Sequence, residues 1–159
     1  DMAVYFGLGD WHDLEVELLF PVYLVPVCSK KMLDTKHPLK TPQDLQHYPL
    51  IHVSRRLYEW PEWLRLSNID YVGFNRGMQL DSNQLATTAA REGLGVALAD
   101  RTLSAREIDG GVIYAPFDVV LDSQRAFYLV QARDASMTYG VKVFKEWLLD
   151  EVARDRRKV

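Results

Sequence analysis

The most specific candidate for binding chemistry in this sequence is a helix start at Ser82 and Asn83. Residues 81–99 predict a capped helix, a glycine stop at Gly93 and a buried strand in direct succession, with Asp81 or Ser82 as the cap. The amides of Ser82 and Asn83 lie at the positive end of the helix dipole, where they suit a carboxylate or another anionic or polar group. The same pattern is typical of an ordinary core helix with an ordinary cap. The predicted apolar stripe of this helix consists of Leu85, Ala86, Ala89 and Ala90.

No residue pattern of a catalytic, metal or cofactor site stands out. The four histidines, at positions 12, 37, 47 and 52, belong to different predicted elements, and none is three or four residues from another. The sequence has no Gly-x-Ser-x-Gly elbow. Gly93 and Gly95 lack the third glycine of a dinucleotide loop and follow a helix instead of a strand. We therefore expect no catalytic residue, no metal and no cofactor, and we expect that the chain is not an enzyme.

The composition is that of an ordinary globular domain. The chain has 159 residues, of which 48% are hydrophobic and 26% charged, which fits one domain or two small lobes. The net charge of −3 provides no overall attraction for nucleic acid or an anionic membrane, and no apolar run approaches the ~18 residues of a membrane span. Cys28, the single cysteine, fits a reducing compartment, so we expect a cytoplasmic protein. Because Asp1 opens directly on a strand-like segment, we expect that an upstream part has been removed.

Strand-like and helix-like segments alternate along the chain, which predicts an α/β protein. A buried strand is expected over 2–6, and a strand with one wet face over 14–20. Pro21 and Pro26 are expected to interrupt the extended run that follows and to mark a crossover between lobes. Further strands are predicted over 50–53, 96–99, 112–117 and 125–131, and helices over 42–47, 58–64, 101–108 and about 138–154.

Six segments in register resemble one protein family. They are residues 1–11, 23–29, 39–45, 92–98, 127–130 and 143–148, and the first is similar to a D-x-A-I-R-x-G-x-G-x-W motif. The motifs resemble the effector-binding domain of LysR-type transcriptional regulators, in the subgroup of glycine-cleavage and β-lactamase regulators. The resemblance implies an α/β, periplasmic-binding-protein-like fold of two lobes joined by crossover strands. Residues 1–20 and 133–159 would then form an incomplete first lobe, and 21–132 the second.

The resemblance also implies a small effector in the crevice between the lobes. We expect it against the helix start and the aromatic wall of Tyr128, with the backbone of a glycine loop opposite. The alternative is a helix cap, a core tyrosine and a surface turn. Tyr5 stands where the family has an arginine, which would alter what the first lobe accepts. The candidate effector-binding residues are Tyr5, Gly7, Leu8, Gly9, Ser82, Asn83 and Tyr128.

Two hypotheses about function follow. In the first, the chain is the sensory part of a cytoplasmic transcription factor, and an effector such as an amino acid, peptide or carboxylate shifts the geometry of the lobes. DNA would be bound only through an N-terminal domain that this chain lacks. The second hypothesis is a solute-binding protein of a transporter. We also expect self-association, because Phe144, Trp147 and Leu148 would otherwise meet water, and we expect no contact with a membrane.

Overall fold

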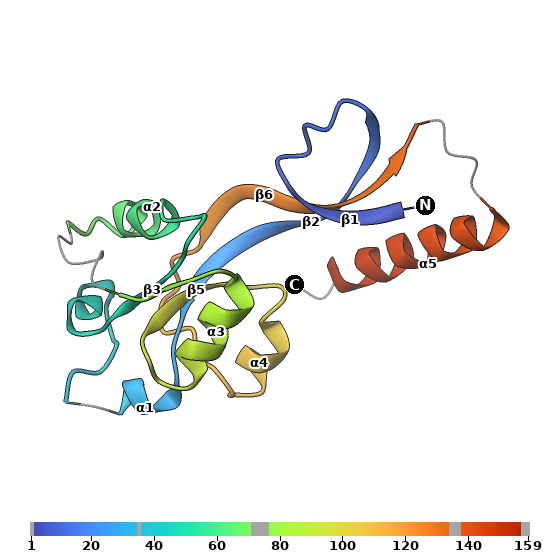
Figure 1. The fold of residues 1–159 in the computed structure, drawn as a ribbon. Coiled ribbons are helices and arrows are strands. Elements are labelled where there is room, and N and C mark those ends of the chain that lie inside the picture. The colour runs from blue at the N-terminus through green and yellow to red at the C-terminus, as the bar shows by residue number, and fades with distance from the viewer. Residues whose placement is uncertain (1, 35, 71–76, 134–137, 157–159) are drawn as a thin grey trace. The chain divides into compact units, whose positions relative to one another are not determined.

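The chain folds into two compact units in the computed structural model, which describes residues 2–34, 36–70, 77–133 and 138–156. Unit 1 comprises residues 1–22 and 124–159, and unit 2 comprises residues 23–123. The chain passes from one unit to the other within two long strands, β2 (Leu14–Val27) and β6 (Leu121–Ala132) (Figure 1). The predicted lobe boundaries, at 20/21 and 132/133, concern the two lobes of the family fold. They stay a prediction, because the boundaries of the two compact units do not test them.

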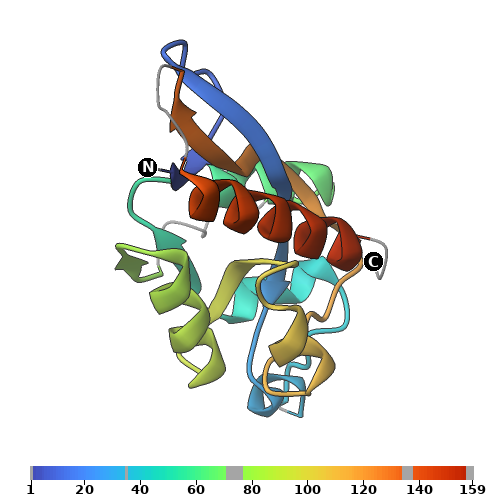
Figure 2. The ribbon, with the colours of Figure 1, turned by 90° about the vertical axis from the view of Figure 1, so that its right-hand side faces the viewer.

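Unit 1 is a small sheet accompanied by one long helix. Strand β1 (Met2–Gly7) is antiparallel to β6, from Met2 opposite Gln131 to Gly7 opposite Ala126, and β6 lies next to β2. Helix α5 (Tyr139–Arg156) lies along one face of this sheet (Figures 1 and 2), and its Lys145 pairs with Glu17 of β2.

The prediction that residues 2–6 form a buried strand is correct about the strand and wrong about its burial. The side chains of Ala3, Val4 and Tyr5 are exposed. The reason is that β1 pairs with β6 on one side only and ends the strand order, so it is an edge strand in the described part of the chain. An apolar run alone does not distinguish an edge strand from a central one.

The expected break at Pro21 and Pro26 is also wrong, because β2 continues through both residues. The carbonyl of Tyr23 accepts a hydrogen bond from the amide of Arg101, directly after β5, at 2.8 Å. In an antiparallel pair, hydrogen-bonded and non-hydrogen-bonded positions alternate, so the residues of β2 that bond to β5 are every second residue counted from Tyr23. Pro26 lies opposite Leu98 between these bonded positions. Its missing amide hydrogen therefore costs no bond to that strand, and a proline there is compatible with an unbroken β2.

Unit 2 is a layer of strands covered by short helices. Its strand order is β2, β5 (Val96–Asp100), β3 (Leu50–Val53) and β4 (Gln79–Leu80), with β2 antiparallel to β5 and β3 parallel to both of its neighbours. Helix α3 (Asn83–Arg91) packs its buried alanines onto this sheet. The other helices are α1 (Lys30–Leu33), a 3₁₀ helix (Pro42–His47), α2 (Glu59–Leu66) and α4 (Ala105–Asp109).

Two tryptophans of α2 anchor that helix in the core. Trp60 and Trp63 are buried, and their rings meet edge to face with centroids 5.8 Å apart. Both indole N–H groups find backbone acceptors: Trp60 donates to the carbonyl of Ile51 at 2.9 Å and Trp63 to that of Val119 at 3.0 Å. The polar edges of both rings are therefore satisfied inside the core.

The remaining sequence predictions for unit 2 are partly confirmed. The 3₁₀ helix begins after Thr41 as predicted, and the Asp44 carboxylate accepts the amide of Thr41 at 2.8 Å. Residues 112–117 do not form a strand, because their only ladder contact among the described residues is an isolated bridge between Tyr114 and Cys28. The helix predicted over 101–108 is shorter, since the Asp100 carboxylate holds residues 102 and 103 in a turn before α4 begins at Ala105. Across the described ranges, no helix combines the length and apolar character of a membrane span.

Candidate functional site

The start of α3 has the geometry expected from the sequence. Ser82 is the N-cap, and its hydroxyl accepts a hydrogen bond from the amide of Leu85 at 3.2 Å. The Asn83 side-chain amide donates to the carbonyl of Leu98 in β5 at 2.8 Å, which ties the helix start to the sheet. The amides of Asn83 and Gln84 precede the first helical hydrogen bond, from Ala86 to the Ser82 carbonyl, and so lie at the positive end of the dipole. This pair is one residue later than the predicted amides of Ser82 and Asn83, because Ser82 is the N-cap.

The apolar stripe of α3 differs from the prediction at one position. Ala86, Ala89 and Ala90 are buried against the sheet as expected. Leu85 is 53% exposed and is therefore not part of the buried face of α3. Gly93 adopts the left-handed conformation that the sequence predicted, with φ of 84°.

The helix start lies at the carboxyl end of the parallel strands. Ser54, directly after β3, donates its hydroxyl to the carbonyl of Leu80 at 3.2 Å and to the Asp81 carboxylate at 3.4 Å. These bonds connect the ends of β3 and β4 next to the first residue of α3. In open α/β sheets, ligands bind outside the carboxyl ends of the strands, so this edge is the expected place for a ligand in unit 2.

A buried carboxylate ends β5 at the same edge. Asp100 is 3% exposed, and its Oδ1 accepts the amides of Thr102 at 2.8 Å and Leu103 at 3.1 Å. Burial raises the pKa of the Asp100 carboxyl above its ordinary value, while these hydrogen bonds and the charge of Arg56 act in the opposite direction. The second oxygen, Oδ2, has no hydrogen-bond partner within the described residues.

In unit 1, three aromatic side chains surround the glycine loop. Tyr5 of β1 lies directly opposite Tyr128 of β6, and the Tyr128 hydroxyl donates to the carbonyl of Leu8 at 3.4 Å. Trp11 meets both rings edge to face, with centroids 5.4 Å from Tyr5 and 5.7 Å from Tyr128. The glycine loop, residues 7–9, therefore forms one contiguous aromatic cluster with Tyr5, Trp11 and Tyr128.

Two positions of this loop have no space for a side chain. Gly9 has φ of 83°, and a Cβ built on it would lie 2.8 Å from Cζ of Tyr128. A Cβ on Gly7 would lie 2.9 Å from Cζ2 of Trp11. The close approach of backbone to ring explains both glycines and fixes the position of the two aromatic side chains.

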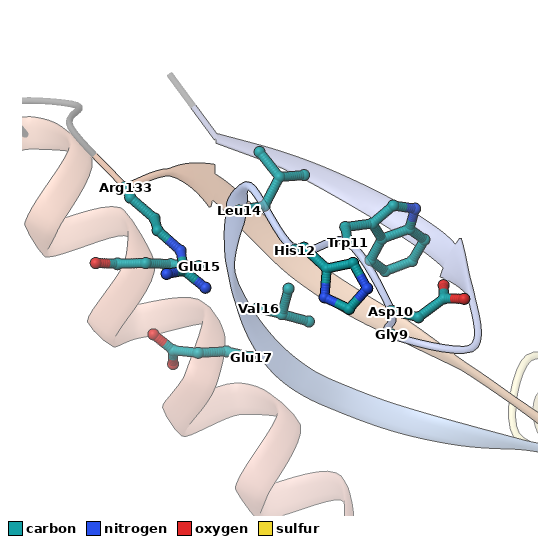
Figure 3. A pocket seen from close by; sticks show the side chains of 9 residues that line it. All are labelled: Gly9, Asp10, Trp11, His12, Leu14, Glu15, Val16, Glu17 and Arg133. Atoms are coloured by element: carbon teal, nitrogen blue, oxygen red, sulfur yellow. The ribbon is translucent and has the colours of Figure 1, made fainter.

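A polar hollow of about 600 Å³ adjoins the aromatic cluster within unit 1 (Figure 3). Glu15 accepts a hydrogen bond from the Gln131 side chain, and Glu17 pairs with Lys145. Two of the carboxylates that line this hollow, those of Glu15 and Glu17, are thus already bound to neighbouring side chains. Its lining consists of Gly9, Asp10, Trp11, His12, Leu14, Glu15, Val16, Glu17 and Arg133.

The structure brings together five of the seven candidate residues. Tyr5, Gly7, Leu8, Gly9 and Tyr128 lie in the aromatic cluster of unit 1. The other two, Ser82 and Asn83, are adjacent at the start of α3 in unit 2. Sequence reasoning missed Trp11, although it closes the G-x-G-x-W segment and contacts both tyrosines.

The residue types that ligate metals are scattered in the part of the chain that the structure describes. No group of three or more histidine, cysteine, aspartate or glutamate side chains there could hold a metal ion. His37 and His47 stack with centroids 4.3 Å apart, but as a pair on the surface. Cys28 is buried, and burial raises the pKa of its thiol to about 12.

Comparison with known proteins gives consistent matches. The model of a family described as the LysR substrate binding domain matches residues 1–153. The glycine cleavage system transcriptional activator of Escherichia coli K12 is 37% identical over 160 residues, covering 99% of this chain and 52% of that protein. The chain therefore spans about half the length of the curated relatives it matches.

Solved structures agree in fold. The effector domain of the transcriptional regulator AmpR of Pseudomonas aeruginosa superposes with a TM-score of 0.84 at 29% identity, covering 99% of this chain and 74% of that one. A Citrobacter freundii effector binding domain with threonine-to-valine, serine-to-alanine and tyrosine-to-phenylalanine substitutions superposes with a TM-score of 0.83 at 25% identity, covering 96% and 75%. The mixed α/β architecture is thus that of these effector domains.

Proposed function

From the premise that this chain belongs to the LysR substrate-binding domain family, we propose that it senses a small effector for a DNA-binding transcriptional regulator. Its relatives are transcriptional regulators, which disfavours the alternative of a transporter's solute-binding protein and an enzymatic role. A regulator acts where its DNA is, so the proposal includes a cytoplasmic location. The observation that carries the proposal is the start of α3, where Ser82 caps the helix and Asn83 is tied to β5.

The chemistry of that helix start suggests the effector's class. The first amides of α3 and the dipole favour a carboxylate or another anionic or polar group, as in an amino acid, a short peptide or a small organic acid. We propose that the effector also contacts the aromatic cluster of unit 1, where the Tyr128 hydroxyl and the backbone of the Gly7–Gly9 loop supply polar groups. Binding of such an effector would favour one conformation of the protein over others.

The DNA-binding step is assigned to a part of the protein outside these residues. The chain carries a net charge of −3, and neutralising phosphates requires clustered lysine and arginine. We therefore expect that this chain alone gives no saturable, sequence-dependent shift of a promoter fragment. A specific shift would contradict the assignment.

The effector proposal is tested by a thermal-shift screen of amino acids, short peptides and small carboxylates, followed by titration calorimetry. If the effector found is a carboxylate, Ser82→Asn should preserve both the helix cap and the affinity for the effector. Ser82→Asp also preserves the helix cap, but it should weaken effector binding by about tenfold or more, because its negative charge repels the carboxylate. Tyr128→Phe weakens binding without loss of the fold.

Matched controls separate binding from stability. Ser67→Ala removes a hydroxyl that donates to the carbonyl of Trp63 at 3.0 Å in α2, and Tyr139→Phe removes a hydroxyl from a residue that is 84% exposed. Neither change alters effector affinity if the proposal is right. Unchanged affinity in both Ser82→Asp and Tyr128→Phe would show that these side chains do not contact the effector.

A further inference from the structure

A carboxylate lies directly beside the helix start of unit 2. Asp81 immediately precedes the N-cap Ser82, and its side chain is exposed. The hydroxyl of Ser54, at 3.4 Å from Oδ1, is the hydrogen-bond partner of this carboxylate among the described residues. Because Ser54 directly follows β3, the Asp81 carboxylate is directed toward the carboxyl end of the parallel strands, where a ligand is expected.

The helix start and this carboxylate attract groups of opposite charge. The first amides of α3, those of Asn83 and Gln84, favour an anionic group, whereas Asp81 favours a cationic one. Asp81 is only two residues from Asn83, a stretch of chain that spans at most about 7 Å. An α-amino acid carries its carboxylate and its ammonium group on one carbon atom, so it also presents both charges over a short distance.

A buried carboxylate at the same edge also favours positive charge. Strands β3 and β5 are parallel, so Ser54 and Asp100 come at matching positions along them. Asp100 is 3% exposed, and its Oδ2 has no hydrogen-bond partner within the described ranges. The charge of Arg56 acts on Asp100, but the same guanidinium pairs with the buried carboxylate of Glu59 at 3.2 Å. One guanidinium thus faces two buried carboxylates, which leaves negative charge in excess there.

Two further arginines at this edge do not distinguish between effectors. Arg55 follows Ser54 and Arg101 follows Asp100, and both side chains are exposed, so water and salt screen their charges. Their charges would favour a plain carboxylic acid and an amino acid alike, because both compounds carry a carboxylate. Discrimination between these two classes therefore depends on the carboxylate of Asp81.

We propose that the effector is a free α-amino acid, whose carboxylate binds the first amides of α3 and whose ammonium group binds the carboxylate of Asp81. This inference rests on the proposed function, because it assigns a class of effector to the same helix start. Asp81 then determines specificity, since it selects compounds with an ammonium group against otherwise equal carboxylic acids. The buried Asp100 adds to the negative potential at this edge without contacting the effector.

The test compares each amino acid with the 2-hydroxy acid that has the same side chain, first by thermal shift and then by titration calorimetry. In each pair a hydroxyl replaces the ammonium group, and the carboxylate and the side chain stay the same. We expect the amino acid that binds most tightly to bind about tenfold or more tightly than its 2-hydroxy counterpart, because the counterpart lacks the charged contact with Asp81.

A variant of Asp81 and a matched control separate this contact from general effects. Asp81→Asn keeps the size of the side chain and an acceptor for Ser54, and it should reduce the preference for the amino acid to within about threefold. Asp34→Asn is the control: Asp34 is also exposed, but it caps the end of α1, which follows β2. Because β2 is antiparallel to β5, Asp34 lies at the opposite edge of the sheet, and its substitution should leave the preference unchanged.

Circular dichroism of each variant establishes that it is folded, so a lost preference is not a lost fold. A preference for the amino acid that disappears in Asp81→Asn and persists in Asp34→Asn supports the inference. Three results overturn it and leave the proposed function in place: equal binding of 2-hydroxy acids, a preference that survives in Asp81→Asn, or binding of peptides alone. Binding of no amino acid, peptide or carboxylate would count against the proposed function as well.

Discussion

Substitution of Gly9 by alanine tests the aromatic cluster of unit 1 directly. Gly9 has φ of 83°, and its new Cβ would lie 2.8 Å from Cζ and 2.9 Å from the hydroxyl of Tyr128. The left-handed conformation costs a non-glycine residue about 1–2 kcal/mol. Displacing a packed ring costs typically 1–3 kcal/mol more. We therefore expect Gly9→Ala to lower the free energy of unfolding by about 2–5 kcal/mol.

The two contributions separate in a double-mutant cycle with Tyr128→Ala, measured by urea denaturation. Removing the ring removes the clash, so Gly9→Ala should cost only the backbone strain of about 1–2 kcal/mol in that background. Gly140→Ala is the control: a Cβ there meets nothing within 4 Å, and alanine in α5 should stabilise by up to about 1 kcal/mol. A neutral Gly9→Ala, or an equal cost with and without the Tyr128 ring, would refute this account of the loop.

Three further predictions concern ionisable groups of unit 2. Because burial raises the pKa of Asp100, its ionised form destabilises the folded protein. Asp100→Asn retains an acceptor for the amides of Thr102 and Leu103, so this variant should be at least as stable as the parent protein in urea at neutral pH. Its stability advantage should shrink as the pH falls through the pKa of Asp100 in the folded protein. The amide of Thr41 lowers the pKa of Asp44, so the ionised Asp44 stabilises the folded protein. This stabilisation is complete above the unfolded pKa of about 3.9 and is lost as the pH falls through the pKa of the folded state. In the Asp44→Asn variant, the urea midpoint should therefore fall less steeply with decreasing pH than in the parent protein. Cys28, with a thiol pKa of about 12, should react with a disulfide reagent at mildly alkaline pH only at the rate at which unit 2 opens, and rapid reaction of the folded protein would contradict its burial.

Elements specified by neighbouring residues were predictable from the sequence. The cap at Ser82 and the turn at Gly93 depend on residues within one helical turn, and both appear in the structure. The same holds for the 3₁₀ helix after Thr41, whose start is fixed by Asp44 three residues later. Each of these features is a short-range hydrogen bond or a local backbone conformation, and the types of the neighbouring residues are enough to predict it.

Features that depend on distant partners were predicted less well. The burial of β1 depends on how many strands flank it, and its apolar sequence carries no such information. Pro26 is tolerated because of its register against Leu98, more than 70 positions along the chain. Residues 112–117 have strand-like side chains, yet only Tyr114 finds a ladder partner.

The same distinction explains which candidate residues the sequence could identify. Ser82 and Asn83 were identified because a helix start is a local signal, whereas Trp11 was not, because its role exists only once Tyr5 and Tyr128 are paired across β1 and β6. The glycine loop lies between these cases: its flexibility is visible in the sequence, but the ring that forbids a side chain at Gly9 comes from a strand nearly 120 residues away. A variant at Trp11 is therefore a more informative probe of the cluster than a variant at either tyrosine alone. Trp11→Phe keeps an aromatic ring while changing the contacts of this ring with both Tyr5 and Tyr128.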